Sequence, residues 1–193
     1  MAALDELGIA VAIDAMPNEL PDPIKFSEDT VHASYDPDAV GRFLQILVNS
    51  DRVFKQFRTG FLGKASPVHF FWGSFDLAVT RFSGRRAPER PGADSITRES
   101  YSHEVISHGW WPGGGPVNEP AFYAYAAPEP PGFKTIVAEP IAAFYSPEFS
   151  EFVLPYEAVR TASDPPAAIR AFVESTYARA ADLAGWDRQA LER

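Results

Sequence analysis

Cysteine is absent from this sequence of 193 residues. Its absence excludes a disulfide framework, a zinc site with thiolate ligands, an iron–sulfur cluster and a cysteine nucleophile. The chain also lacks a run of about 18 apolar residues, so no transmembrane helix is predicted. Near the start, Asp5 and Glu6 stand where a secretory signal carries Lys or Arg. We therefore expect a cytoplasmic protein without membrane contacts.

Positive charge is scarce: 17 Lys and Arg face 26 Asp and Glu, for a net charge of −9. This balance, and the absence of a known nucleic-acid-reading motif, argue against a nucleic-acid partner. The basic residues are concentrated in residues 52–100, which hold nine Lys or Arg against four Asp or Glu. Either the basic side chains of this segment form a local anion site, or the fold places them far apart from one another.

Several signatures of nucleotide-binding proteins and hydrolases are missing as well. The chain contains no GxxxxGK[ST], no GxGxxG and no GxSxG pattern. The composition is nevertheless that of a folded protein, with 46% hydrophobic and 13% aromatic residues. The length favours one domain over residues 1–193. The abundance of Ala, Arg, Pro and Asp with few Lys is typical of a bacterium with a GC-rich genome.

Two helices are predicted from their caps and apolar stripes. Asp36-Pro37 and Asp164-Pro165 each place a capping carboxylate before a proline at the first helical position. Apolar residues then recur at helical spacing over about 37–62 and 165–184.

Alternation of apolar and polar residues predicts strands in the rest of the chain. We expect strands at 9–13, 31–35, 68–82 (bent at Gly73), 121–126, 133–138 and 149–154. Eleven of the 18 prolines fall in residues 112–166, which favours short strands there. The element order predicts an α+β fold, with a mixed or largely antiparallel sheet and both helices on one face.

The segment from Ser100 to Gly115 is the richest in chemistry-bearing side chains. If it is helical, Glu104 and His108 lie on one face and can share a metal, while His103 points away. If it is extended, His103 and His108 face opposite sides. The spacing lacks HExxH geometry, so polar residues in a loop are the simpler interpretation.

Asp76 follows the apolar run that begins at His69 and stands between Phe75 and Leu77. A buried carboxylate needs a partner, and Arg81 or an arginine of the following loop is the natural candidate. The simpler alternative is a structural ion pair. The functional one is a catalytic or ligand-orienting acid.

A turn-rich loop from Ser83 to Gly92 carries Arg85 and two further arginines. Guanidinium groups suit carboxylates and phosphates, although a solvated loop is the commoner explanation.

Two adjacent tryptophans, Trp110 and Trp111, precede a glycine-rich stretch that resembles a lid or pocket wall. Both rings should be packed, on the core or on a ligand. Tyr123 and Tyr125 fall on one face of the next predicted strand and can line the same cavity.

Three separated strings of this chain are distinctive: Ser66 to Arg85, His32 to Pro37, and Ser102 to Gly113. Together they resemble a bacterial family of domains of unknown function numbered 5996. The resemblance implies a shared fold and no activity. It also implies that this chain corresponds to the C-terminal two-thirds of the family's members. The missing segment then either leaves a sheet edge or a cleft unfilled or is supplied by a partner chain.

Two hypotheses of function remain. The first is a small-molecule-binding or enzymatic domain, optionally assisted by a divalent metal. Its catalytic groups are Asp76 and Glu104, its ligand-binding residues Trp110, Trp111, Arg81, Arg85 and Tyr123, and its metal ligands His69, His103 and His108. The alternative is a non-catalytic interaction domain, with a partner chain or a second copy against the tryptophans and prolines. Convergence of the polar groups in one concave space would favour the first.

Overall fold

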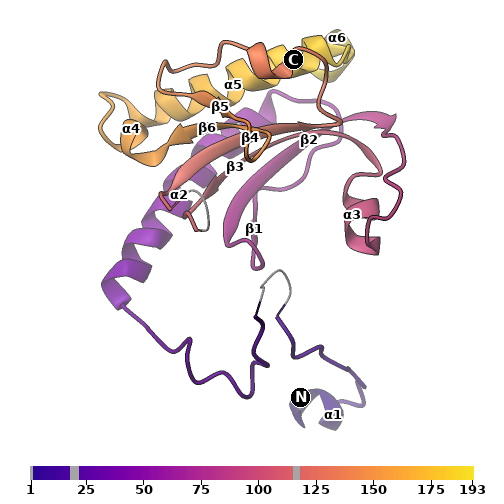
Figure 1. The fold of residues 1–193 in the computed structure, drawn as a ribbon, viewed down its shortest axis with the longest axis vertical. Helices are drawn as coiled ribbons and strands as arrows, with labels where there is room; N and C mark the ends of the chain where they lie inside the picture. The colour runs from indigo at the N-terminus through magenta and orange to yellow at the C-terminus, as the bar shows by residue number, and fades with distance from the viewer. Residues whose placement is uncertain (1, 18–21, 115–117) are drawn as a thin grey trace. The chain divides into compact units, whose positions relative to one another are not determined.

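The computed structural model describes residues 2–17, 22–114 and 118–193 (Figure 1). The chain divides into two compact units, residues 1–40 and 41–193. None of the helices in the described ranges has the length and hydropathy of a membrane span.

The N-terminal unit contains the short helix α1 (Ala2–Glu6), and its described residues include no strand. The predicted strands at 9–13 and 31–35 are therefore wrong. Ile9 is 48% exposed and Val31 is 72% exposed. Alternation alone does not make a strand, because the backbone N–H and C=O groups need a neighbouring strand. The described residues of this unit provide none.

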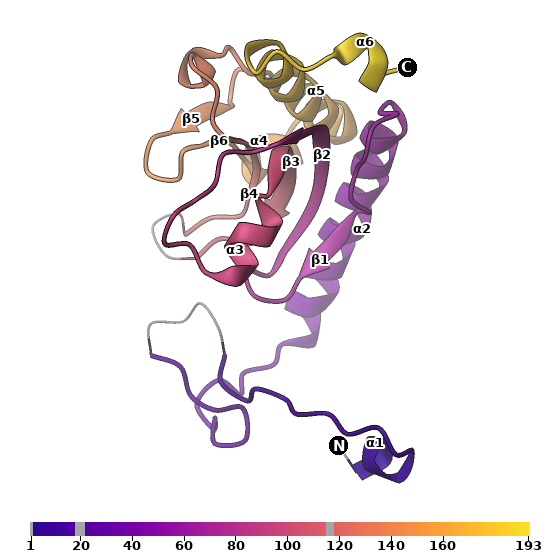
Figure 2. The same ribbon diagram turned by 90° about the vertical axis from the view of Figure 1, so that its right-hand side faces the viewer.

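The second unit is built on a six-stranded antiparallel sheet with the strand order β1-β2-β3-β4-β6-β5 (Figure 2). The strands are β1 (His69–Phe71), β2 (Asp76–Arg86), β3 (His103–Trp111), β4 (Ala121–Ala127), β5 (Phe144–Ser146) and β6 (Glu151–Pro155). The α+β prediction with a largely antiparallel sheet is confirmed.

Two long helices cover one face of this sheet: α2 (Pro37–Thr59) and α5 (Pro165–Leu183). Asp36 accepts hydrogen bonds from the backbone N–H groups of Asp38 and Ala39, and Asp164 accepts one from Ala167. Both predicted caps are confirmed. The shorter helices are α3 (Ser95–Ser100), the 3-10 helix η1 (Phe133–Thr135), α4 (Tyr156–Arg160) and α6 (Arg188–Leu191).

Two of the predicted strands take a different form. The run 68–82 is a hairpin of β1 and β2, because residues 72–75 turn tightly instead of bending. The predicted strand at 133–138 is wrong: Gly132, with a φ of +87°, precedes the 3-10 helix η1, and the residues after η1 are irregular. Phe133 and Ala138 of this stretch are nevertheless buried in the core. The segment from His103 to Trp111 is a strand, so the extended alternative for this segment is confirmed and the helical one is wrong.

Strand alternation gives the sheet two distinct faces. The helix face carries the main core, where Phe54 and Phe57 of α2 meet Phe122 and His108. The alternate residues of each strand point away from the two long helices and form what we call the outer face. Helix α3 lies on that side of the sheet (Figures 1 and 2). On β3 these outer-face residues are Val105, Ser107, Gly109 and Trp111.

Candidate functional site

Asp76 opens β2 on the outer face and is only 6% exposed. Its Oδ1 accepts a 2.7 Å hydrogen bond from the Ser74 hydroxyl, and its Oδ2 accepts one from the Tyr123 hydroxyl. No basic side chain in the described ranges forms an ion pair with it. The predicted pairing with Arg81 is wrong. Positions 76 and 81 are five apart on one strand, so their side chains point to opposite faces.

Arg81 instead lies in the core on the helix face. Its guanidinium carbon stacks 3.4 Å from the centroid of the Phe57 ring and 4.1 Å from that of Tyr177, and Nη2 donates to the Phe57 carbonyl. Burial lowers the pKa of Arg81 to about 10, and the guanidinium remains charged near neutral pH. Its aromatic surroundings give it a structural role, away from the outer face.

Tyr123 reaches Asp76 by crossing the intervening strand. Tyr123 on β4 is paired with Gly109 on β3, and β2 lies on the far side of β3. A Cβ atom on Gly109 would lie less than 3.0 Å from the ring and hydroxyl of Tyr123. The absence of a side chain at Gly109 is therefore what lets a β4 residue bind a β2 carboxylate.

A second tyrosine continues this layer on β4. The Tyr125 ring stacks on Tyr123 with centroids 6.2 Å apart, and the Tyr101 hydroxyl donates a hydrogen bond of 3.2 Å to the Tyr125 hydroxyl. The predicted shared face of Tyr123 and Tyr125 is confirmed. Burial raises the pKa of both β4 tyrosines, so each hydroxyl keeps its proton and can donate.

Glu151 is a member of this site that the sequence did not indicate. It begins β6, next to Phe152, which is the cross-strand partner of Ala124; alternation then places Glu151 on the outer face, on the side of Tyr125. Burial, followed by the negative charge of Asp76, raises the pKa of Glu151 to about 7. Its carboxyl therefore exchanges a proton near neutral pH. Only the pairing of β6 beside β4 could identify it, because 75 positions separate Glu151 from Asp76.

The two tryptophans lie on opposite faces of the sheet. Trp111 lies at the outer-face end of β3 against Phe149, with ring centroids 6.3 Å apart. Trp110 is 1% exposed on the helix face, where it packs on Phe43 and Tyr156. Both rings are packed, and only Trp111 borders the outer face. The predicted lid includes residues 115–117, which lie outside the described ranges.

The three histidines nominated as metal ligands do not come together. His69 is on β1, and His103 opens β3 with its Nδ1 3.1 Å from the Ser102 hydroxyl. His108 is fully buried on the helix face and hydrogen-bonds Thr176 on α5 at 3.1 Å. The described ranges hold no group of three His, Cys, Asp or Glu that could bind a metal ion. Burial, with the nearby charge of Arg81, lowers the pKa of His108 to about 3, so its ring is neutral.

Glu104 and Arg85 bind each other away from the outer-face carboxylates. The Glu104 carboxylate accepts from Arg85 Nη2 at 2.7 Å and from the Ser83 hydroxyl at 2.8 Å. Arg85 also donates to the carbonyls of Ala184 and Gly185, at the C-terminal end of α5. These contacts tie the sheet to a helix end whose carbonyls lack helical partners. They give both residues a structural function.

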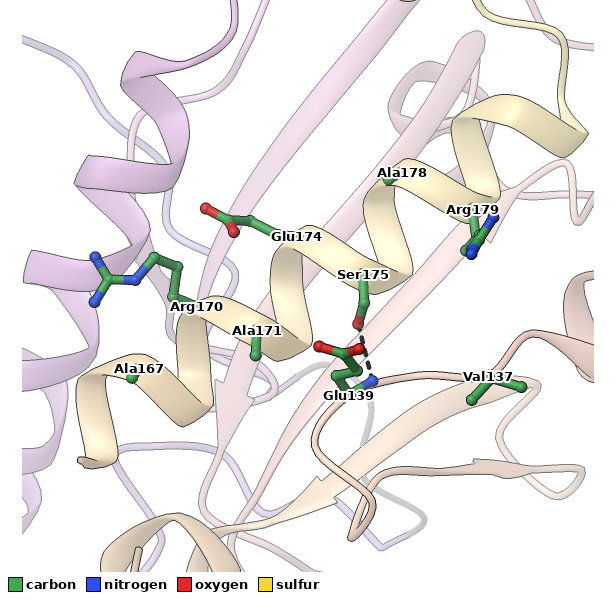
Figure 3. Close-up of a pocket in the computed structure, with 9 residues that line it drawn as sticks. All are labelled: Val137, Glu139, Ala167, Arg170, Ala171, Glu174, Ser175, Ala178 and Arg179. Atoms are coloured by element: carbon green, nitrogen blue, oxygen red, sulfur yellow. Dashed lines mark hydrogen bonds between the residues drawn. The ribbon is translucent and has the colours of Figure 1, made fainter. Parts of the chain in front are cut away.

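A surface groove of about 490 Å³ runs along α5 beside the segment that follows η1 (Figure 3). It carries both signs of charge, on Arg170, Arg179, Glu139 and Glu174. These four side chains are exposed, and Ser175 in the groove accepts a hydrogen bond from the Glu139 backbone N–H. None of the predicted site residues lines it. Asp76, the buried acid of the described ranges, lies on the outer face instead.

Comparison with known proteins yields one match. A model of a family of unknown function, DUF5996, matches residues 1–193, the whole chain. This extent does not support the expectation that the chain corresponds to the C-terminal two-thirds of the family's members. No curated protein and no solved structure matches.

Proposed function

The chain belongs to DUF5996, a family of unknown function, and on that premise we propose that it is a small-molecule-binding protein. Its binding site is the outer face of the sheet around Asp76, Tyr123 and Glu151. The proposal retains Trp111 and Tyr123 from the ligand-binding residues that the sequence nominated, and Asp76 from the catalytic ones.

One observation carries this proposal: Asp76 is buried on the outer face without a basic partner among the described residues. Asp is rarely buried unless it is paired, because removing a charge from water costs several kcal/mol. The two hydroxyl donors compensate only part of that cost. A carboxylate kept in such a position is typical of a binding or catalytic site.

The surroundings of Asp76 also suit a small ligand. Ala78, Ser107 and Gly109 are small residues of the outer face, and the tyrosine rings lie over this part of the sheet. Binding sites combine such aromatic surfaces with a few fixed polar groups. If the ligand reacts, Glu151 is the group that can donate or accept a proton at neutral pH. Glu104 is excluded from this proposal because Arg85 already engages it.

A ligand screen on the full chain tests the proposal. Saturation-transfer NMR with a broad metabolite library should give ligands whose binding is lost in Tyr123→Phe and Asp76→Asn. Arg170→Ala on α5 is the matched control and should leave binding intact, since it lies on the opposite side of the molecule's core. Ligands that bind all variants equally, or no ligand in the library, would count against the outer face as the site.

The hairpin between β1 and β2 favours a second candidate function, contact with another macromolecule. Trp72 is 81% exposed, and Phe71 and Phe75 beside it are 44% and 45% exposed. Exposed aromatic clusters are common at protein interfaces. Under this alternative, Trp72→Ser would abolish an association detected by light scattering while ligand binding stays unchanged.

A further inference from the structure

Resting on the second candidate function, we propose that the β1–β2 hairpin is a dimer interface whose partner is a second copy of this chain. The edge strand β1 pairs antiparallel with β1 of the other copy across a twofold axis, and Trp72 becomes buried beside this junction.

The first argument is the open edge of the sheet at β1. This strand stands at one end of the strand order and pairs only with β2. Among the described residues, no backbone-to-backbone hydrogen bond beyond the β1–β2 pairing involves residues 68–71. Unpaired N–H and C=O groups of an edge strand are a template for another strand. A second β1 in antiparallel orientation satisfies the edges of both copies at once, as a twofold axis requires.

The second argument is the lack of charge around this edge. Residues 65–75 include no Lys, Arg, Asp or Glu, although charged side chains commonly protect edge strands from pairing with each other. The chain has a net charge of −9, so two copies repel each other over most of their surfaces and approach most easily at an uncharged one. A basic partner would instead gain most from acidic surfaces, which this hairpin lacks. The charge pattern therefore favours a second copy.

The third argument is the conformation of the turn that joins the two strands. Phe75 has a φ of 61°, in the left-handed region that bulky residues rarely adopt. Its ring stacks on Phe43 of α2, with centroids 5.4 Å apart. Trp72 packs edge-on against Phe70 and Phe75 and is still 81% exposed. The fold thus holds a strained turn in place while leaving its tryptophan in solvent, and such strain is typical of functional sites.

The apolar surface of the hairpin continues onto α2. Leu44 and Val48, one helical turn apart, are 59% and 37% exposed. Arg58 of the same helix donates a hydrogen bond to the carbonyl of Ser66, in the segment that leads into β1. Leu44 lies about four helical turns before Arg58 and is therefore on the same flank of α2, beside the edge strand.

The size of this surface matches the requirement of a dimer. The exposed fractions of Leu44, Val48, Phe71, Trp72 and Phe75 correspond to about 500 Å² of apolar surface, if a large side chain has about 150–250 Å² in full. A stable interface buries about 800 Å² per copy, and about 65% of it is apolar in homodimers. The hairpin and α2 therefore provide the apolar area that such an interface needs.

Sedimentation equilibrium of the full chain tests the proposal. We expect the mass to rise with concentration from 21.2 kDa to twice that value. Trp72→Ser should weaken the dimer by about thirtyfold, since interface tryptophans often dominate affinity, and Leu44→Gln by about fivefold. Both replace exposed side chains, so the variants should fold. Ile141→Ser, at a position that is 98% exposed, is the matched control and should leave the dimer intact.

Amide hydrogen exchange locates the junction. Exchange of residues 68–72 should slow as the protein concentration rises, because the edge N–H groups gain carbonyl partners in the dimer. In Trp72→Ser, exchange at the same residues should remain fast over that concentration range. Acrylamide quenching of the wild type and of Trp72→Phe, compared with each other, reports the accessibility of Trp72.

A monomer at every concentration, a dimer that is insensitive to Trp72→Ser, or edge exchange that is independent of concentration would each overturn the inference. A monomer with an accessible Trp72 would leave the second candidate function standing with a different macromolecule as partner. A monomer with a shielded Trp72 would remove that function as well, because another part of the same chain would cover the hairpin. The metabolite screen tests the outer-face site separately.

Discussion

Gly109 and Tyr123 are cross-strand partners, and the ring of Tyr123 occupies the space where a side chain at position 109 would stand. Because Gly109 has no side chain, the Tyr123 ring can lie across β3 and its hydroxyl reaches Asp76 two strands away. The glycine on β3 thus permits the hydrogen bond between β4 and β2 at the candidate site. The arrangement leaves no room for a side chain at position 109.

Gly109→Ala should therefore disrupt both stability and binding. The added methyl group must displace the Tyr123 ring, and overpacking of this kind costs about 1–3 kcal/mol of unfolding free energy. Urea denaturation measures the loss, and the ligand titration measures the effect on the site. Gly41→Ala is the control: this helical glycine has open space around its Cβ position. That control should be neutral or stabilise by up to about 1 kcal/mol. Equal effects of the two substitutions would contradict the packing argument.

Glu151→Gln should stabilise the free protein above neutral pH. The pKa of Glu151 is about 7 in the folded state and 4.5 without perturbation, so the native state retains a proton that the unfolded chain has released between these values. The wild type consequently loses stability as pH rises from 4.5 to about 7. The glutamine avoids this loss and should gain about 1–2 kcal/mol at about pH 8, with no gain at about pH 4. Denaturant titrations at both pH values check this, and a gain that is independent of pH would contradict it.

His108 should make the protein less stable in mild acid. Its pKa is about 3 in the folded state against 6.5 without perturbation, so the unfolded chain binds a proton that the native state excludes. Stability is therefore fully present above pH 6.5 and declines as pH falls toward 3. Between about pH 7 and about pH 5 this group contributes a loss of about 2 kcal/mol.

The comparison of His108→Gln with His69→Gln isolates this effect. The first substitution should flatten the pH dependence of the unfolding free energy. The second replaces a histidine of the edge strand β1 and is the control for the loss of a histidine outside the core. A parallel response in both variants would assign the acid sensitivity to other groups.

Arg85→Ala should destabilise the protein without affecting ligand binding. The substitution removes the donors to Ala184 and Gly185 and the partner of Glu104. Since Arg85 is half-exposed, we expect a loss of only about 1 kcal/mol. Arg86→Ala, at the neighbouring exposed arginine, is the control and should change little.

Glu104→Gln tests the same tie from its other end. Ligand affinity should match that of the wild type, because this carboxylate is held on the helix face by Arg85 and Ser83. A loss of ligand binding in Glu104→Gln with unchanged stability would return Glu104 to the functional site.

Some features followed from local sequence chemistry. The two long helices were predictable because Asp36-Pro37 and Asp164-Pro165 supply their caps within the chain itself. The shared face of Tyr123 and Tyr125 followed from alternation, which depends only on the strand backbone. The same parity rule separates Asp76 from Arg81, and applying it to that pair would have avoided the predicted ion pair. The resemblance to the family was also recognisable from short strings, and the family match confirms it.

Other features required long-range pairing. The alternating residues 9–13 look like a strand, but the described residues of their unit include no strand that could pair with them. The candidate site also depends on strand pairing, and here the pairing is present. Asp76, Tyr123 and Glu151 lie on three different strands. The contact of Asp76 with Tyr123 and the raised pKa values of Tyr123 and Glu151 arise only when β2, β3, β4 and β6 align. The sequence by itself determined the helices, the faces of the strands and the family. The tertiary structure decided which faces meet, because strand order and register are set by packing between segments distant in the chain.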